Sequence, residues 1–176
     1  LHGPFAESIV KRGIEKGLVE VNIHDIRDYT TNKHKKVDDT PFGGAAGMVL
    51  AMQPLHDAIV KLKSERDYNE VIFLTPDGER LAQGRVNQLS LCGNILMICG
   101  HYKGIDQRLR DNLITLEISI GDYVLTGGEL PAMILVDSIS RQVPGVLGKF
   151  ESLEEERISS GEIYTRPAEI KWKDKK

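Results

Sequence analysis

Residues 119–131 read Ser119-Ile120-Gly121-Asp122-Tyr123-Val124-Leu125-Thr126-Gly127-Gly128-Glu129-Leu130-Pro131. The stretch begins at the end of a strand-like apolar run, 116–120, and ends where Pro131 suits the start of a helix. It contains three glycines and one aromatic ring but no lysine or arginine, so it lacks the cation of a typical phosphate-binding loop. We expect it to hold a small, flat, uncharged group against main-chain N–H and C=O groups.

Two other apolar runs also lead into glycine-containing turns. Residues 71–74 precede Thr75-Pro76-Asp77-Gly78, and residues 95–99 precede Gly100-His101-Tyr102-Lys103-Gly104. Continuously apolar runs are typical of parallel strands that are covered on both faces. Helical patterns over about 80–90, 105–112 and 131–142 alternate with these runs, which predicts an α/β fold with a largely parallel sheet flanked by helices. All three turns should then lie at the carboxyl edge of the sheet, where ligands bind.

The first third of the chain gives weaker signals. Its pattern predicts a helix over 4–16 that stops at Gly17, a strand over 19–23 and a helix over 54–63. The segment 28–47 has no periodicity and many turn residues, so we expect a long loop, and loops of this length are usually functional or disordered. The loop contains cations that suit contacts with phosphates, although a merely solvated basic loop is the alternative. The cations are Lys33, Lys35 and Lys36, and His34 lies among them.

Bulk composition limits the possible functions. The 176 residues carry a formal net charge of −3, so any contact with RNA must come from a local basic patch. Cys92 and Cys99 have no ligand spacing and the histidines lack metal-ligand spacing, so we expect buried thiols in a reducing compartment and no metal site. No apolar run approaches the ~18 residues of a membrane span, and no signal peptide is visible. A cytoplasmic protein with no membrane partner is expected.

Five segments together resemble one known family. The turns at 74–78, 100–106 and 119–131 have the order and spacing found in bacterial tRNA (guanine-N1)-methyltransferases, the TrmD family. Residues 37–44 resemble that family's glycine-rich loop, and Tyr164-Thr165-Arg166-Pro167 resembles its linker motif. The resemblance implies methylation of N1 of the tRNA guanine 3′ of the anticodon, position 37, with S-adenosylmethionine as donor. It also implies a SPOUT fold with a C-terminal deep trefoil knot and a homodimer with shared active sites, and it suggests a magnesium requirement.

The resemblance also assigns a donor pocket. Each turn alone is readily explained as an ordinary tight turn, but three of them at one sheet edge favour a binding site, because glycine lets the main chain approach a ligand closely. The implied lining residues are Leu74, Thr75, Pro76, Gly100, Tyr102, Gly104, Ile120, Gly121, Asp122, Tyr123, Val124, Leu125, Gly127, Gly128 and Pro131. His34 and Asp38 match family positions near the target guanine.

The acceptor chemistry needs a base and a cation. Guanine N1 carries a proton, and negative charge develops on O6 when that proton leaves. Arg141 matches the family's arginine at the base edge; its alternative role is that of a favourable cation at a helix C-terminus. The family's catalytic aspartate falls at Glu156, where Glu156-Arg157-Ile158 replaces the usual Asp-Ser-Phe. A carboxylate misplaced by about 1 Å can cost roughly 100-fold in rate, and a solvated acidic run is the alternative for 154–156.

The end of the chain differs in composition from the rest. An acidic cluster within 151–156 and a basic tail at 171–176 predict that residues 149–176 form a segment leaving the catalytic domain, 1–148. In the family this segment leads to a helical tRNA-binding domain, which we expect to be absent here. Two other functions stay open: a non-catalytic SPOUT dimer that binds the donor or RNA, and a SPOUT methyltransferase that acts on another RNA position.

Overall fold

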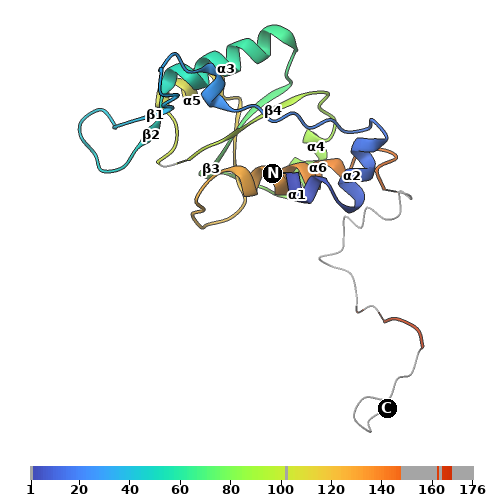
Figure 1. Ribbon diagram of the computed structural model, residues 1–176. Coiled ribbons are helices and arrows are strands. Elements are labelled where there is room, and N and C mark those ends of the chain that lie inside the picture. Colours follow the sequence, from blue (N-terminus) through green and yellow to red (C-terminus); the bar gives the residue numbers. More distant parts are fainter. Residues whose placement is uncertain (1, 102, 148–161, 163, 168–176) are drawn as a thin grey trace.

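A parallel three-stranded sheet forms the centre of the molecule, with the strand order β4-β3-β5. The computed structural model describes residues 2–101, 103–147, 162 and 164–167. The strands are β3 (Glu70–Arg80), β4 (Ile95–Cys99) and β5 (Leu116–Ser119). Ile72 of β3 lies opposite Met97 of β4 and Leu116 of β5. Figure 1 shows helices on both sides of this sheet, which confirms the α/β prediction.

Side chains of β3 alternate between two hydrophobic cores. Val71 and Phe73 pack on one face against α3 and α5, while Ile72 and Leu74 pack on the other against α4 and α6. None of these four side chains is more than 4% exposed. Both faces of the strand are therefore buried, which explains why this run contains no polar residue. The helices are α3 (Met52–Glu65), α4 (Gln83–Leu89), α5 (Gln107–Leu113) and α6 (Glu129–Ser140).

The N-terminal segment contains two short helices where one was predicted. They are α1 (His2–Phe5) and α2 (Ser8–Glu15), separated by a break at which Ser8 has a φ of 53°. Phe5 and Val10 line the same groove, and in one continuous helix they would point about 140° apart. The predicted stop at Gly17 is confirmed, because its φ is 69° and its N–H donates to the carbonyl of Ile14 at 2.9 Å.

The prediction of a strand at 19–23 is wrong, whereas the predicted long loop at 28–47 is mostly confirmed but contains one short strand. Residues 19–23 have no strand partner among the described residues, and Ile23 is 48% exposed. The later segment opens with a 3-10 turn, η1 (Ile26–Tyr29), and contains β1 (Asp38–Asp39), which pairs antiparallel with β2 (Val49–Leu50). A two-residue strand is too short to produce a periodic pattern.

The base of this long segment is fixed to the second glycine-containing turn. The N–H of Leu50 donates to the carbonyl of Gly104, and the N–H of Lys103 donates to the carbonyl of Met48, both at 3.1 Å. Val37 and Leu50 are buried in the core beside α3. The tip at 40–47 is therefore held at both ends. No helix in the described part of the chain has both the length and the apolar character of a membrane span.

Candidate active site

The three glycine-containing turns meet in one pocket of about 250 Å³ at the carboxyl ends of the strands. Most of the residues predicted to line a donor site do line this pocket. They are Leu74, Thr75, Pro76, Gly100, Gly104, Ile120, Gly121, Tyr123, Val124, Leu125, Gly127, Gly128 and Pro131. Tyr102 lies outside the described residues. The convergence expected from parallel strands is thus observed.

Asp122 is a correction to the predicted lining. Its side chain is 80% exposed and pairs with Arg80 instead of facing the pocket. Gly121, with a φ of 155°, and Tyr123 do line the pocket on either side of it. The main chain therefore turns Asp122 outward, where a carboxylate stays hydrated and meets a cation.

The first turn is a bulge within β3 and does not end the strand. Leu74 and Glu79 both align with Ile118 of β5, so residues 75–78 loop out of the sheet toward the pocket. A Cβ added to Gly78 would lie 2.6 Å from the main-chain carbon of Glu117. Glycine is required at this position because two backbones touch there, as is common at bulges.

The third turn packs directly on the second. Gly127 forms an antiparallel bridge with His101, and the N–H of Gly128 donates to the carbonyl of Gly100 at 2.8 Å. A Cβ on Gly128 would lie 2.7 Å from the Cα of Cys99 and 2.9 Å from the N of Gly100. This backbone-to-backbone contact closes one wall of the pocket and positions the start of α6.

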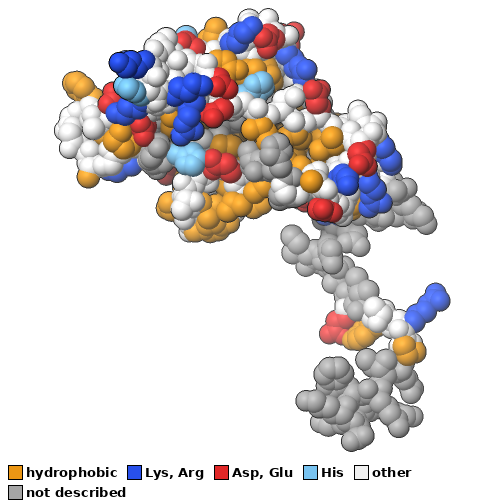
Figure 2. Space-filling model, in the orientation of Figure 1, with side chains coloured by type: hydrophobic (Ala, Val, Ile, Leu, Met, Phe, Trp, Pro, Cys, Tyr) orange, Lys and Arg blue, Asp and Glu red, His pale blue; other side chains and the backbone are white. Residues whose placement is uncertain are grey.

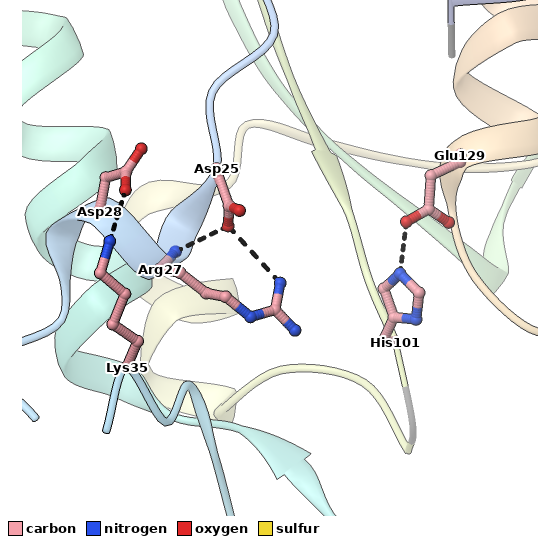
Figure 3. A network of polar contacts seen from close by, with 6 residues as sticks. All are labelled: Asp25, Arg27, Asp28, Lys35, His101 and Glu129. Atoms are coloured by element: carbon pink, nitrogen blue, oxygen red, sulfur yellow. Dashed lines mark hydrogen bonds and ion pairs between the residues drawn. The ribbon is translucent and has the colours of Figure 1, made fainter. Parts of the chain in front are cut away.

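A contact between a histidine and a carboxylate reinforces the packing of the third turn on the second. Figure 3 shows His101 at the end of β4 reaching Glu129 in the first turn of α6, where Nε2 of the histidine meets a carboxylate oxygen. A carboxylate in this first turn also favours the helix dipole. The sequence predicts His101 to be an ordinary residue beside the donor pocket; in the structure it lines the pocket and connects the second turn to α6.

The two cysteines are unsuited to nucleophilic chemistry. Burial, with a smaller contribution from the charge of Glu129, raises the pKa of the Cys99 thiol to about 11. Burial also raises the pKa of Cys92. Both thiols therefore stay protonated at neutral pH. Within the described ranges, no three His, Cys, Asp or Glu side chains come together as potential metal ligands.

Of the two predicted acceptor residues the structure describes only Arg141, which does not line the pocket. Arg141 caps the C-terminus of α6, whose other end lies at Gly128. The 12 residues of this helix span about 18 Å, so Arg141 is far from the pocket of its own chain. Glu156 lies outside the described residues, and so do the neighbouring positions 154 and 155. Tyr164 and Pro167 of the linker motif are described, and both are exposed.

The predicted RNA-contacting cations lie on the exposed segment between η1 and β1. Lys35 pairs with Asp28 at 3.1 Å, as Figure 3 shows, and the N–H of His34 donates to Oδ1 of Asn32 at 2.8 Å. Lys33 and Lys36 are exposed, and Asp38 is half-buried in β1. Figure 2 shows several basic side chains, with acidic ones among them, at the upper left, where Figure 1 labels β1. In a chain of net negative charge, any contact with RNA needs a local group of cations, and these lysines provide one.

An apolar groove of about 570 Å³ lies beside the pocket, between the N-terminal helices and α6. Tyr123, Leu130 and Ile134 contribute exposed side chains to it, each 46–54% accessible. Figure 2 shows hydrophobic side chains gathered along the lower edge of the molecule. The groove is lined by Phe5, Val10, Ile120, Tyr123, Leu125, Leu130, Met133, Ile134, Asp137 and Ser138. Exposed apolar patches of this kind mark interaction surfaces.

The three-layer fold and the strand-end pocket define an α/β enzyme of the class that binds small ligands at the carboxyl edge of a parallel sheet. The model of one family, described as tRNA (Guanine-1)-methyltransferase TrmD, matches residues 1–174. The chain therefore belongs to the TrmD family of tRNA (guanine-1)-methyltransferases. The resemblance carried by the five motifs is confirmed.

Named relatives agree with this assignment. The tRNA (guanine-N(1)-)-methyltransferase of Flavobacterium psychrophilum is 60% identical over 178 aligned residues, covering 98% of this chain and 79% of its own. The same-named protein of Bacteroides fragilis is 53% identical with the same coverage. The crystal structure of tRNA (m1G37) methyltransferase from Aquifex aeolicus is similar with a TM-score of 0.81 and 37% identity, over 97% of this chain and 72% of that one.

The pocket also includes residues that were not predicted. Asp77, His101, Lys103 and Thr126 all line it. The available signal was that each belongs to one of the three quoted turns. The spacing of residues in the sequence could not show which of these side chains face the pocket. Their direction depends on the bulge in β3 and on the packing of Gly128 against Cys99 and Gly100.

Proposed function

We propose that this chain transfers a methyl group from S-adenosylmethionine to N1 of guanine 37, the nucleotide 3′ of the anticodon in tRNA. The observation that carries the proposal is the convergence of the three family turns on one pocket. Family membership and the names of the relatives, including the m1G37 enzyme of Aquifex aeolicus, support the same substrate.

The pocket suits the adenosine end of such a donor. Its walls include the main chain of Gly100, Gly104 and Gly128, where no side chain keeps a flat ligand away from the backbone. There is no room for a Cβ on Gly128 or on Gly100, where it would lie 2.8 Å from the ring of Phe73. When bound, the donor supplies a methyl group on a positively charged sulfur. The chain's own contribution is to hold the two reactants close and aligned.

In this proposal two residues act on the acceptor, the guanine base of the tRNA. Arg141 stabilises the negative charge that develops on guanine O6, and Glu156 takes the proton from N1. Since Arg141 lies about 18 Å along α6 from the pocket of its own chain, we assign it to the pocket of a second protomer. The apolar groove beside α6 supports a homodimer with shared active sites, because such a surface is favourably covered.

Several finer features belong to the same proposal. A deep trefoil knot is supported by the packing of the third turn across the second. Residues 1–148 would form the catalytic domain and 149–176 a segment leading from it. The described residues offer no ligand cluster for magnesium, so no step is assigned to a metal. A tRNA substrate places the protein in the cytoplasm.

A labelling experiment tests the function. A tRNA transcript with guanine at position 37 and the same transcript with adenine there are incubated with the protein and methyl-labelled donor. We expect 1-methylguanosine in the first transcript only, detected by nucleoside mass spectrometry. Donor binding without any transfer would favour the non-catalytic dimer. Label appearing in ribosomal RNA offered in competition would favour another RNA position.

The basic segment should contribute salt-dependent affinity for tRNA. Substituting Lys33 and Lys36 together by Gln removes two exposed cations, leaving the Lys35–Asp28 pair in place. We expect weaker binding to every tRNA sequence, and a slope of log affinity against log salt that is shallower by about 1.4–1.8. Filter binding at several salt concentrations measures this slope.

A control variant separates local contact from overall charge. Substituting Lys61 and Lys63 by Gln removes the same charge from α3. The control should leave the slope nearly unchanged. Equal changes in the two variants would contradict a specific role for the segment between η1 and β1.

A further inference from the structure

Lys103 is a pocket-lining cation that the proposed function has not yet used. It shares the pocket with three other ionisable side chains, Asp77, His101 and the phenol of Tyr123. His101 is already paired with Glu129. Lys103 forms no ion pair with an acid in the part of the chain that the structure describes. Its ammonium group is therefore available to a ligand.

Two contacts fix the direction of this side chain. The main chain is held by the hydrogen bond from the N–H of Lys103 to the carbonyl of Met48, at 3.1 Å. The stem then passes over Gly47, where an added Cβ would lie 2.9 Å from Cε and 3.2 Å from Cδ. Gly47, with a φ of 97°, leaves the room that the stem occupies. Packing of the stem limits its rotamers, so less entropy is lost when the ammonium group binds an anion.

The charges around the pocket are complementary to one part of the donor. The turn 119–131 contains no lysine or arginine and suits the neutral adenosine end. The other end of S-adenosylmethionine is an amino acid with an ammonium and a carboxylate. Lys103 and Asp77 offer one charge of each sign. Asp77 is also near Arg110, whose pKa is raised by its hydrogen bonds to Glu117 and further by the charge of Asp77.

We propose that Lys103 is a positioning residue that binds the carboxylate of the donor's methionyl group. The assignment rests on the proposed function. A charge-assisted hydrogen bond to this carboxylate restrains the chain that carries the sulfur, and so restrains the methyl group relative to the acceptor. Lys103 should therefore distinguish ligands with the amino-acid tail from ligands that contain only the adenosine and sulfur part.

Calorimetry with two ligands tests this distinction. S-adenosylmethionine carries the carboxylate, whereas 5′-methylthioadenosine keeps the adenosine and the sulfur but has no amino-acid tail. For Lys103→Gln we expect about tenfold weaker binding of S-adenosylmethionine, the loss typical of one partly hydrated hydrogen bond to a charged group. Binding of 5′-methylthioadenosine should be unchanged. Lys103→Arg should recover most of the loss, and Lys63→Gln on α3 should affect neither ligand.

Three results would overturn the assignment. An unchanged affinity for S-adenosylmethionine would exclude the contact. Equal weakening of both ligands would show a deformed pocket. A loss confined to tRNA binding would place Lys103 on a phosphate. If the unsubstituted protein binds neither adenosyl ligand, that result would contradict the proposed function and, with it, the assignment of Lys103.

Discussion

Gly128→Ala is expected to abolish donor binding, with at least about 100-fold loss of affinity, because it separates the two turns that form one pocket wall. The added methyl group would lie 2.7 Å from the Cα of Cys99 and 2.9 Å from the N of Gly100. Both are main-chain atoms, so no side-chain rotation relieves the clash. Backbone conformation is not the cause, since the φ of −79° at Gly128 is accessible to alanine.

The same substitution should lower the free energy of unfolding by about 1–3 kcal/mol, the usual cost of overpacking. Thermal unfolding without ligand and calorimetry with S-adenosylmethionine measure the two effects separately. Gly127→Ala is the matched control. The atoms nearest to its methyl group would belong to the side chains of His101 and Glu129, which can rotate away at the cost of the contact between them. Donor affinity that survives in Gly128→Ala, or a larger loss in the control, would contradict the packing argument.

The central sheet and its helices were predictable because both of their signals are local. Residues 71–74 are apolar without interruption since every side chain of that run enters one of two cores. The helix at 52–65 buries Leu55, Ala58, Ile59 and Leu62 at helical spacing, as predicted. The carboxyl-edge pocket followed from topology, because parallel strands bring their ends together.

The remaining features depend on contacts between distant segments. The break before Ser8 places Phe5 and Val10 on one groove, which no local pattern shows. Gly78 and Gly128 are each required by a backbone on another element, so in the sequence they look like ordinary turn glycines. The outward direction of Asp122 and the inward direction of Lys103 are likewise set by packing.

Arg141 lies at the end of α6 that is far from the pocket of its own chain. Its position at the far end of α6, about 18 Å from Gly128, makes a role in its own pocket geometrically implausible. As a stabiliser of charge on O6 it should matter greatly for turnover: Arg141→Ala is expected to lower kcat by about 10²–10³, as loss of such a donor does elsewhere. Donor affinity, measured by calorimetry, should stay within about twofold, because that pocket is untouched.

Mixing two inactive variants decides between the two pockets. A protomer with Arg141→Ala keeps its donor pocket, and a protomer with Gly128→Ala keeps its arginine. If Arg141 serves the other protomer, each mixed dimer contains one intact site, and an equal mixture should recover about one quarter of the unsubstituted activity. Differently tagged chains allow mixed dimers to be purified and counted. Mixed dimers that form but stay inactive would show that Arg141 serves the pocket of its own chain. Recovery would show that Arg141 of one chain acts beside the methyl donor held by the other chain.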